Sequence, residues 1–265
     1  MTLKSHANII ASMLIRFLKV LFVVVFLISC TGSREEFLTG SDKELYDLIN
    51  KEINKKKKYV VLNHTDFDLL EDMITTLQIR FPYSPYTREA YLLSADVAFK
   101  RKRYNLAIKE YTEFLNNQVN HPKTDYATFK LLKSQSLLIA AKDKNDDPAK
   151  EILRIYDSLS AVYKSTEYMD ETQRIYIKAK KFLLKRAIYV ANFYIKKDQY
   201  ESALGRLNNT EILIPNLVNN SSEAQYLIVL SKIKLSKDAD KNTLLNNYKK
   251  KFPKSKFIEN LEELL

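Results

Sequence analysis

One residue of the chain has distinctive chemistry, and it is Cys30, the single cysteine. It follows the stretch "MLIRFLKVLFVVVFLIS" (13–29), in which Arg16 and Lys19 precede an apolar run from Val20 to Ile28. The run is about half of the ~20 residues that a membrane-spanning helix needs. It therefore predicts the core of a signal peptide rather than a permanent span. The Cys30 thiol is the nucleophile in this stretch that can be alkylated.

The sequence Leu27-Ile28-Ser29-Cys30 resembles the lipobox of bacterial lipoproteins. The resemblance implies that residues 1–29 are removed as a signal peptide, that diacylglycerol is linked to Cys30, and that the new amino terminus is acylated, for example with palmitate. Two or more acyl chains hold a protein at a bilayer essentially permanently, whereas one chain does not. Met13 is an alternative start of translation. The other interpretation of Cys30 is a lone buried cysteine after an ordinary apolar helix.

No catalytic motif is present in the sequence. It has no HExxH, GxSxG or Walker loop and no cysteine–histidine pair. The three histidines, His6, His64 and His121, have no metal-ligand spacing. Some cell-wall lytic enzymes carry long helical superhelices, but they also need a compact catalytic domain, and no segment is left to build one. The sequence predicts a protein without enzymatic activity, cofactor or metal ion.

A set of bases recurs at spacings of three and four residues in segment 170–197. They are Arg174, Lys178, Lys181 and Lys185. A second stripe at the same spacing is apolar and predicts the core face of a helix. It consists of Tyr176, Ala179, Leu183, Ala187, Val190 and Tyr194. The basic stripe can meet acidic side chains of a partner protein, and the other interpretation is a solvated surface.

The net charge is +11, but the sequence does not predict a nucleic-acid partner. Such a partner would require arginine clusters or stacking aromatics beside a basic stripe. Composition points to helices instead. The hydrophobic content of 46% is sufficient for a sizeable core, and the chain has only 3 Gly and 6 Pro. Sheet proteins and α/β enzymes need glycine for hairpin turns and phosphate loops, so we expect long helices with short connections.

Two windows of the sequence align without a gap. In both, a small residue is followed by an aromatic nine positions later and by an alanine three positions after that. The residues are Ala95, Tyr104 and Ala107 in the first window and Ala191, Tyr200 and Ala203 in the second. The pattern resembles the tetratricopeptide repeat, in which small side chains mark the closest approach of two antiparallel helices. The tyrosine is expected to pack across the turn between them.

A short motif predicts the joints between such helix pairs. An aromatic residue, a serine or threonine and a second aromatic recur three times, as Phe81–Ser84–Tyr86, Tyr163–Thr166–Tyr168 and Phe252–Ser255–Phe257. The first aromatic is expected to close one helix, and proline stops it in two of the copies. Ser84 is expected to cap the next helix, with Pro85 at its first position. The trailing aromatic is expected to pack back against the preceding pair.

We expect five helix pairs and a short closing helix after Ser255. The pairs are expected at about residues 42–80, 85–118, 123–163, 168–214 and 221–250. The predicted organisation is a signal peptide (1–29), a flexible tether (30–41), repeats 1–3 (42–163) and repeats 4–5 (164–265). The predicted fold class is all-α, an α-solenoid of about five tetratricopeptide-like helix hairpins.

A lipobox followed by "RFPYSPYTREAYLLSADVAFKRKRYNLAIKEYTEFLNNQVNHPKTDYATF" (80–129) and "YVANFYIKKDQYESALGRL" (189–207) resembles the BamD family of the β-barrel assembly machinery. The resemblance covers nearly all of the mature chain. It implies a helical scaffold that is lipid-anchored to the outer membrane and faces the periplasm. The implied partners are the periplasmic domains of the BamA barrel protein, other assembly lipoproteins and unfolded barrel precursors. The chain departs from the pattern at Ile152, where alanine is expected.

The resemblance also implies roles for the two halves of the chain. The fourth pair contacts BamA in this family, which assigns the partner-binding role to the basic stripe. The N-terminal half would recognise the C-terminal signal of barrel precursors, with Tyr86, Tyr91 and Phe99 as candidates; the other interpretation of these three is inter-repeat core. Two different functions stay open from the residues alone. One is another periplasmic adaptor, for example in cell-wall synthesis or division, and the other is a surface-exposed lipoprotein that binds host ligands.

Overall fold

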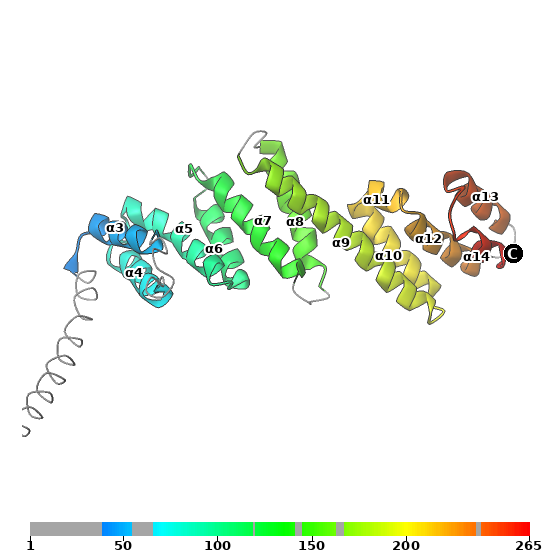
Figure 1. Ribbon diagram of the computed structural model, residues 1–265, viewed down its shortest axis with the longest axis horizontal. Helices are drawn as coiled ribbons and strands as arrows, with labels where there is room; N and C mark the ends of the chain where they lie inside the picture. The colour runs from blue at the N-terminus through cyan, green and yellow to red at the C-terminus, as the bar shows by residue number, and fades with distance from the viewer. Residues whose placement is uncertain (1–38, 55–65, 119, 141–144, 163–166, 237–239) are drawn as a thin grey trace, which may run out of the picture. The chain divides into compact units, whose positions relative to one another are not determined.

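The computed structural model describes residues 39–54, 66–118, 120–140, 145–162, 167–236 and 240–265. Every regular element among these residues is an α-helix, from α3 to α14 in Figure 1. The predicted all-α fold class is confirmed. Cys30 and the predicted signal peptide lie outside the described residues, as does most of the predicted tether. The chain divides into two compact units, Met1–Lys102 and Arg103–Leu265.

The first unit contains three described helices, α3 (Asp42–Ile53), α4 (Phe67–Arg80) and α5 (Pro85–Lys100). Each helix begins with a side-chain cap, which satisfies backbone N–H groups that have no partner within the helix. The caps are Ser41, Asp66 and Ser84. The three helices pack on one another around a common apolar core. Its fully buried members include Leu45, Ile49, Leu70 and Leu77.

The second unit contains the remaining described helices. They are α6 (Tyr104–Asn117), α7 (Thr124–Ala140), α8 (Asp147–Val162), α9 (Met169–Ile195), α10 (Tyr200–Leu213), α11 (Pro215–Asn219), α12 (Ser222–Leu235), α13 (Lys241–Lys251) and α14 (Ile258–Glu262). The ends of the expected helix pairs lie close to the ends of the observed helices. The short helix α11 is an addition that the sequence did not predict. The predicted division of the repeats between residues 163 and 164 falls in a segment outside the described residues and stays a prediction.

The helix contacts within each unit have the pattern of a hairpin solenoid. Consecutive helices pack on each other from α6 to α10, and α10 continues to α12 and α12 to α13. In addition, the first helix of one pair contacts the first helix of the next, as α7 does with α9 and α9 with α12. In the first unit α3 contacts α5 in the same way. Within each unit, successive helices therefore contact their neighbours in sequence, which is how repeat solenoids bury their cores.

The joint motif has the predicted structure at its first copy, and at the last copy Ser255 forms the same local contact although α14 begins without a side-chain cap. Phe81 ends α4, and the Ser84 hydroxyl accepts a hydrogen bond from the Tyr86 backbone N–H at 3.1 Å. The same hydroxyl donates to the Asp42 carboxylate at 2.7 Å. At the last joint, Ser255 accepts from the Phe257 N–H at 3.3 Å and exchanges a hydrogen bond with the Tyr248 hydroxyl at 2.7 Å. Thr166 of the middle copy lies outside the described residues.

The trailing aromatic of each motif packs on the first helix of the preceding pair. The ring of Tyr86 lies 5.1 Å from that of Tyr46 on α3. Tyr168 stacks on Phe129 of α7 at 4.9 Å, and Phe257 stacks on Tyr226 of α12 at 4.5 Å. A hydrogen bond with Glu167 raises the pKa of Tyr168 to about 12, so this ring stays neutral at physiological pH. The three motifs fasten successive pairs through the same kind of ring contact.

The two turns that precede Tyr104 and Tyr200 share a backbone conformation. Lys102 has φ of 60° and Asp198 has φ of 55°, both in the left-handed region. Non-glycine residues adopt this region at a steric cost, and aspartate tolerates it better than most. Asp198 also accepts a hydrogen bond from the Tyr200 hydroxyl at 2.7 Å. The equivalence of the two turns supports the repeat that the aligned sequence windows predict.

The alanines of the two windows are fully buried, as the repeat resemblance implies. Ala191 and Ala203 lie on α9 and α10, which pack on each other in the second unit. Ala95 is buried in the first unit and Ala107 in the second. In the third pair, Ile152 and Ala149 on α8 are both fully buried, so the isoleucine is part of the core there. On α9 and α10, the small side chains of Ala191 and Ala203 let the two helices approach closely.

Ala203→Leu is expected to lower the free energy of unfolding by about 1–3 kcal/mol, because extra methylenes in a close-packed interior force side chains and backbone apart. Urea denaturation followed by circular dichroism measures the change. The matched control is Ser202→Leu, which places the same side chain on an exposed position of α10 and is expected to change stability by less than about 0.5 kcal/mol. Equal stability of the two variants would contradict close helix packing at Ala203.

A polar cluster ties the start of α8 to the two following helices. The Asp146 carboxylate is buried and forms ion pairs with Arg206 of α10 and, at 3.7 Å, with Arg186 of α9. The Asp146 carbonyl also accepts hydrogen bonds from the first turn of α8. A buried carboxylate requires such partners because water no longer solvates it. Asp146 therefore joins three helices of the second unit.

Candidate functional site

The longest helix, α9, has one buried and one exposed face. Its 27 residues extend over about 40 Å at 1.5 Å per residue. Positions three and four apart form the buried face, which packs on α7, α8, α10, α11 and α12. The buried residues are Thr172, Ile175, Ala179, Leu183, Ala187 and Ala191. The helix is thus held along its length by neighbours on one side, and its other side is open.

The predicted apolar stripe is confirmed only in its centre. Ala179, Leu183 and Ala187 are buried, whereas Tyr176, Val190 and Tyr194 are half-buried. Tyr176 stacks on Tyr156 of α8 at 4.1 Å. Burial and the nearby Asp157 raise the pKa of Tyr176, so its hydroxyl stays protonated at neutral pH. The buried face winds around α9 because steps of four residues advance by about 40° per step.

The predicted basic stripe lies on the open side of α9. Arg174, Lys178, Lys181 and Lys185 are all exposed. They occupy an arc of about 60° at 3.6 residues per turn, directly opposite the buried face. None of the four forms an ion pair with any residue that the structure describes. Their positive charges are therefore directed to solvent without a compensating carboxylate from this part of the chain.

The charge on this helix extends further than the predicted stripe. Residues 172–197 contain eight bases and no acid. The additional bases are Lys180, Arg186, Lys196 and Lys197. Arg186 forms an ion pair with Asp146, and Lys180 lies over the Tyr176 ring at 4.9 Å. The absence of any acid over these 26 consecutive positions is visible in the sequence, and it is the signal that could have identified the wider basic surface.

Two aromatic side chains on the open side were not predicted as site residues. Tyr189 is 60% exposed and Phe193 is 51% exposed. Tyr189 follows Lys185 by one helical turn, and Phe193 follows Tyr189 by another. Arg186 lies over the Tyr189 ring at 5.5 Å and Lys197 over the Phe193 ring at 5.4 Å. Large aromatics are usually buried, so their exposure beside a basic stripe marks a surface for contact.

The candidates in the first unit are placed differently from one another. Tyr86 belongs to the packing between helices, against the apolar core of that unit. Tyr91 is 48% exposed on α5, and Phe99 is half-buried near the end of the same helix. Two further apolar side chains near the first joint are exposed, Tyr83 at 99% and Ile79 at 74%. Of the three candidates, Tyr91 presents the largest fraction of its surface to solvent.

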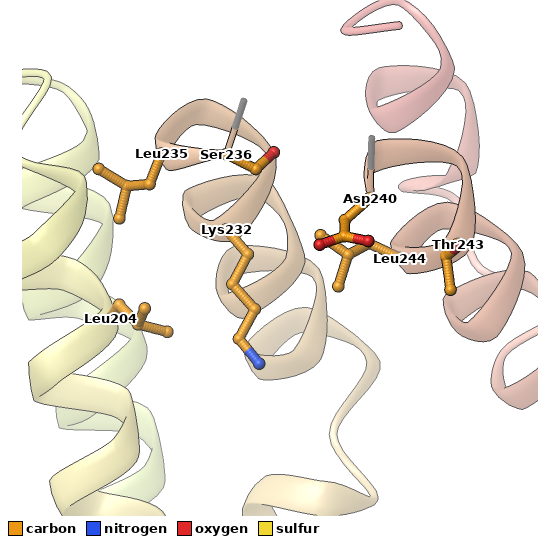
Figure 2. Close-up of a pocket in the computed structure, with 7 residues that line it drawn as sticks. All are labelled: Leu204, Lys232, Leu235, Ser236, Asp240, Thr243 and Leu244. Carbon is orange, nitrogen blue, oxygen red and sulfur yellow. The ribbon is translucent and has the colours of Figure 1, made fainter. Parts of the chain in front are cut away.

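A pocket of about 360 Å³ lies at the ends of α10, α12 and α13 in the second unit. Figure 2 shows its lining, with Leu204 on one side, Leu244 on the other, and Lys232 and Asp240 among the polar groups. Leu235, Ser236 and Thr243 complete it. Its apolar walls suit a small apolar group. The Ser236 hydroxyl in its lining donates a hydrogen bond to the Ile233 carbonyl at 3.2 Å.

Within the described part of the chain, no helix has the length and apolar character needed to cross a bilayer. No group of three or more histidine, cysteine, aspartate or glutamate side chains among the described residues is placed to hold a metal ion. The described surface also carries exposed bases and aromatics on its helices.

Comparisons with known proteins agree with this description. A search of the curated proteins found no significant match. Among solved structures, a tetratricopeptide repeat protein from Parabacteroides merdae is 14% identical, covering 84% of this chain and 98% of that chain with a TM-score of 0.26. At that score the fold assignment rests on the helix contacts rather than on this neighbour. The family model of YfiO, described as an outer membrane lipoprotein, matches residues 51–227. The chain belongs to the YfiO family of outer membrane lipoproteins.

Proposed function

We propose that this lipoprotein is a scaffold of the β-barrel assembly machinery, anchored through Cys30 to the outer membrane and facing the periplasm. In this role the second unit binds the periplasmic domains of a BamA-type barrel protein, and the machinery's other lipoproteins assemble with them. The first unit binds unfolded barrel precursors. Membership of an outer membrane lipoprotein family supports the location, and the helix-pair architecture supports an adaptor rather than an enzyme.

The observation that carries the proposal is the open face of α9. Its basic stripe is fixed on a helix that five neighbouring helices hold in place. A rigid element loses little conformational freedom when a partner binds, so its contacts contribute more fully to affinity. Exposed bases without a carboxylate partner in the described chain favour an acidic surface on the partner, mainly by accelerating and orienting association.

The proposed precursor site rests on exposed apolar side chains of the first unit. Tyr91 on α5 presents nearly half of its surface, and Tyr83 and Ile79 near the first joint are more exposed still. Unfolded barrel precursors expose alternating apolar side chains, and tyrosine offers both an aromatic face and a hydroxyl for such contacts. Tyr86 and Phe99 are proposed to support this surface from the partly buried positions that they occupy.

The proposal is tested by purifying the full-length lipoprotein from detergent-solubilised envelope and identifying its partners by mass spectrometry. A BamA-type barrel protein and other assembly lipoproteins are expected to be enriched over a tagged, unrelated lipoprotein of the same membrane. Enrichment of cell-wall synthesis or division proteins instead would replace the proposal with a different periplasmic adaptor. Loss of the protein when intact cells are treated with protease would place it on the cell surface and contradict the periplasmic orientation.

A further inference from the structure

We propose that the open face of α9 is a docking surface of two parts, the basic stripe and an aromatic end formed by Tyr189 and Phe193. Its occupant is a segment of a partner protein that presents acidic side chains along one stretch and apolar side chains along the next. The inference rests on the proposed function in using the same face, and it adds the residues and the chemistry of the partner.

The two parts follow each other along one helix. Arg174, Lys178, Lys181, Lys185 and Tyr189 lie within an arc of about 80°, and Phe193 is about 40° beyond it. From Arg174 to Phe193 the surface runs about 28 Å at 1.5 Å per residue. The bases occupy the first part of this length and the aromatics the last turn and a half. A bound segment therefore meets charge first and apolar surface afterwards, in a fixed order.

The acidic residues near the run of bases on α9 do not neutralise its charge. Glu171 forms an ion pair at 2.8 Å with Lys133 of α7, and Asp198 accepts a hydrogen bond from Tyr200. Asp146, which faces α9 from the start of α8, is occupied by Arg186 and Arg206. Glu167, just before α9, is hydrogen-bonded to Tyr168, and Asp157 of α8 is hydrogen-bonded to Tyr176. Asp170 lies in the first turn of α9, at the N-terminal end of the run of bases. Acidic side chains of a partner are the missing complement of the bases between these points.

The arrangement favours a protein segment over a membrane surface. A helix that lies in a bilayer interface needs apolar residues along its whole length, with bases at their flanks. On α9 the fully buried residues pack on other helices, the exposed aromatics are confined to one end, and Ile177 is the one large exposed apolar side chain among the bases. Tyrosine and arginine are enriched among the residues that contribute most of the binding energy in protein interfaces. A partner with a matching order of side chains fits both parts at once.

The two parts have different kinetic roles. Bases directed to solvent act at long range, so they control the association rate and its dependence on salt. Aromatic contacts form only in the docked complex, so they control the dissociation rate. Replacing both aromatics by serine is expected to increase the dissociation rate about tenfold and to leave the salt dependence of association unchanged. Tyr189→Phe alone is expected to retain wild-type kinetics.

Photo-crosslinking in cells that produce the full-length lipoprotein tests the proposal directly. p-Benzoylphenylalanine replaces Tyr189, Phe193 or Lys181, and Asn209, exposed on α10, is the control position. Crosslinks from the three α9 positions are expected to map to one protein segment, with acids near the Lys181 crosslink and apolar residues near the others. Crosslinks to phospholipid alone or to a segment without acids would overturn the proposal. So would crosslink yields from the three α9 positions no higher than the yield from Asn209.

A matched pair of variants separates this inference from the proposed function. Tyr189→Ser combined with Phe193→Ser is expected to reduce about tenfold the amount of partner that is crosslinked by p-benzoylphenylalanine in place of Lys181. Ile212→Ser, which removes a side chain that is 79% exposed on α10, is expected to leave it unchanged. If the segment belongs to a protein outside the barrel assembly machinery, the proposed function fails and the docking surface stands. If a barrel protein co-purifies but the aromatic variant loses nothing, the docking surface fails alone.

Discussion

Lys178→Glu combined with Lys185→Glu is expected to reduce the affinity for the barrel protein about 100-fold, which corresponds to roughly 3 kcal/mol. The two substitutions remove two attractions and introduce two repulsions against an acidic partner surface, and like charges that face each other in an interface cost several kcal/mol. Most of the loss is expected in the association rate. Biolayer interferometry with the purified proteins at two salt concentrations measures the association and dissociation rates.

The double variant is expected to fold normally. Both lysines are exposed on α9, and neither is in an ion pair with the described residues. The helical circular dichroism signal should therefore equal that of the wild type. The matched control is Lys250→Glu with Lys254→Glu, which changes the net charge equally at exposed positions near the C-terminal joint. Undiminished binding by the α9 variant, or an equal loss in the control, would remove the basic stripe from the interface.

Asp146→Ala is expected to lower the free energy of unfolding by about 2–3 kcal/mol. Removing one partner of a buried ion pair leaves the other charge without compensation, and such changes cost about 3–5 kcal/mol when burial is complete. The side chains of Arg186 and Arg206 are 22% and 24% exposed, so water recovers part of the cost. Asp146→Ala leaves two arginines facing each other, and we expect the contacts of α8 with α9 and α10 to loosen first.

Urea denaturation of the purified protein measures this loss, and hydrogen exchange of α8, α9 and α10 locates it. Asp147→Ala is the matched control one residue along the chain. The Asp147 side chain is 76% exposed and its pair with Lys150 is 3.9 Å long, so its removal is expected to cost less than about 0.5 kcal/mol. A similar small change for Asp146→Ala would mean that the cluster does not tie the three helices together.

The helix pairs and their joints were accessible from the sequence because they depend on local chemistry. Ser84 caps α5 through a contact two residues away, and Pro85 begins that helix without losing a hydrogen bond. The same reasoning predicted Ser255 at the last joint. Buried Ala191 and Ala203 followed from a spacing that has a direct packing reason. The basic stripe followed from helical periodicity, and its exposure is what that periodicity predicts.

Other features needed the tertiary structure. Short α11 has no periodic pattern to reveal it, since it has five residues. The pair of Asp146 with Arg206 joins residues 60 positions apart, and no local pattern links them. The apolar stripe of α9 is confirmed only in its centre because several helices cover it at different heights, so Tyr176, Val190 and Tyr194 are half-buried.

Local sequence patterns were enough to predict the first and last joints, the basic face of α9 and every described helix except α11, because each follows from contacts within a few turns of one helix or its neighbour. Whether a given aromatic is core or surface depended on the packed fold. Tyr86 and Tyr189 are both aromatics on helices, yet Tyr86 packs against α3 and Tyr189 is open to solvent. Burial depends on where the neighbouring helices end, and that is a property of the packed fold rather than of the local sequence.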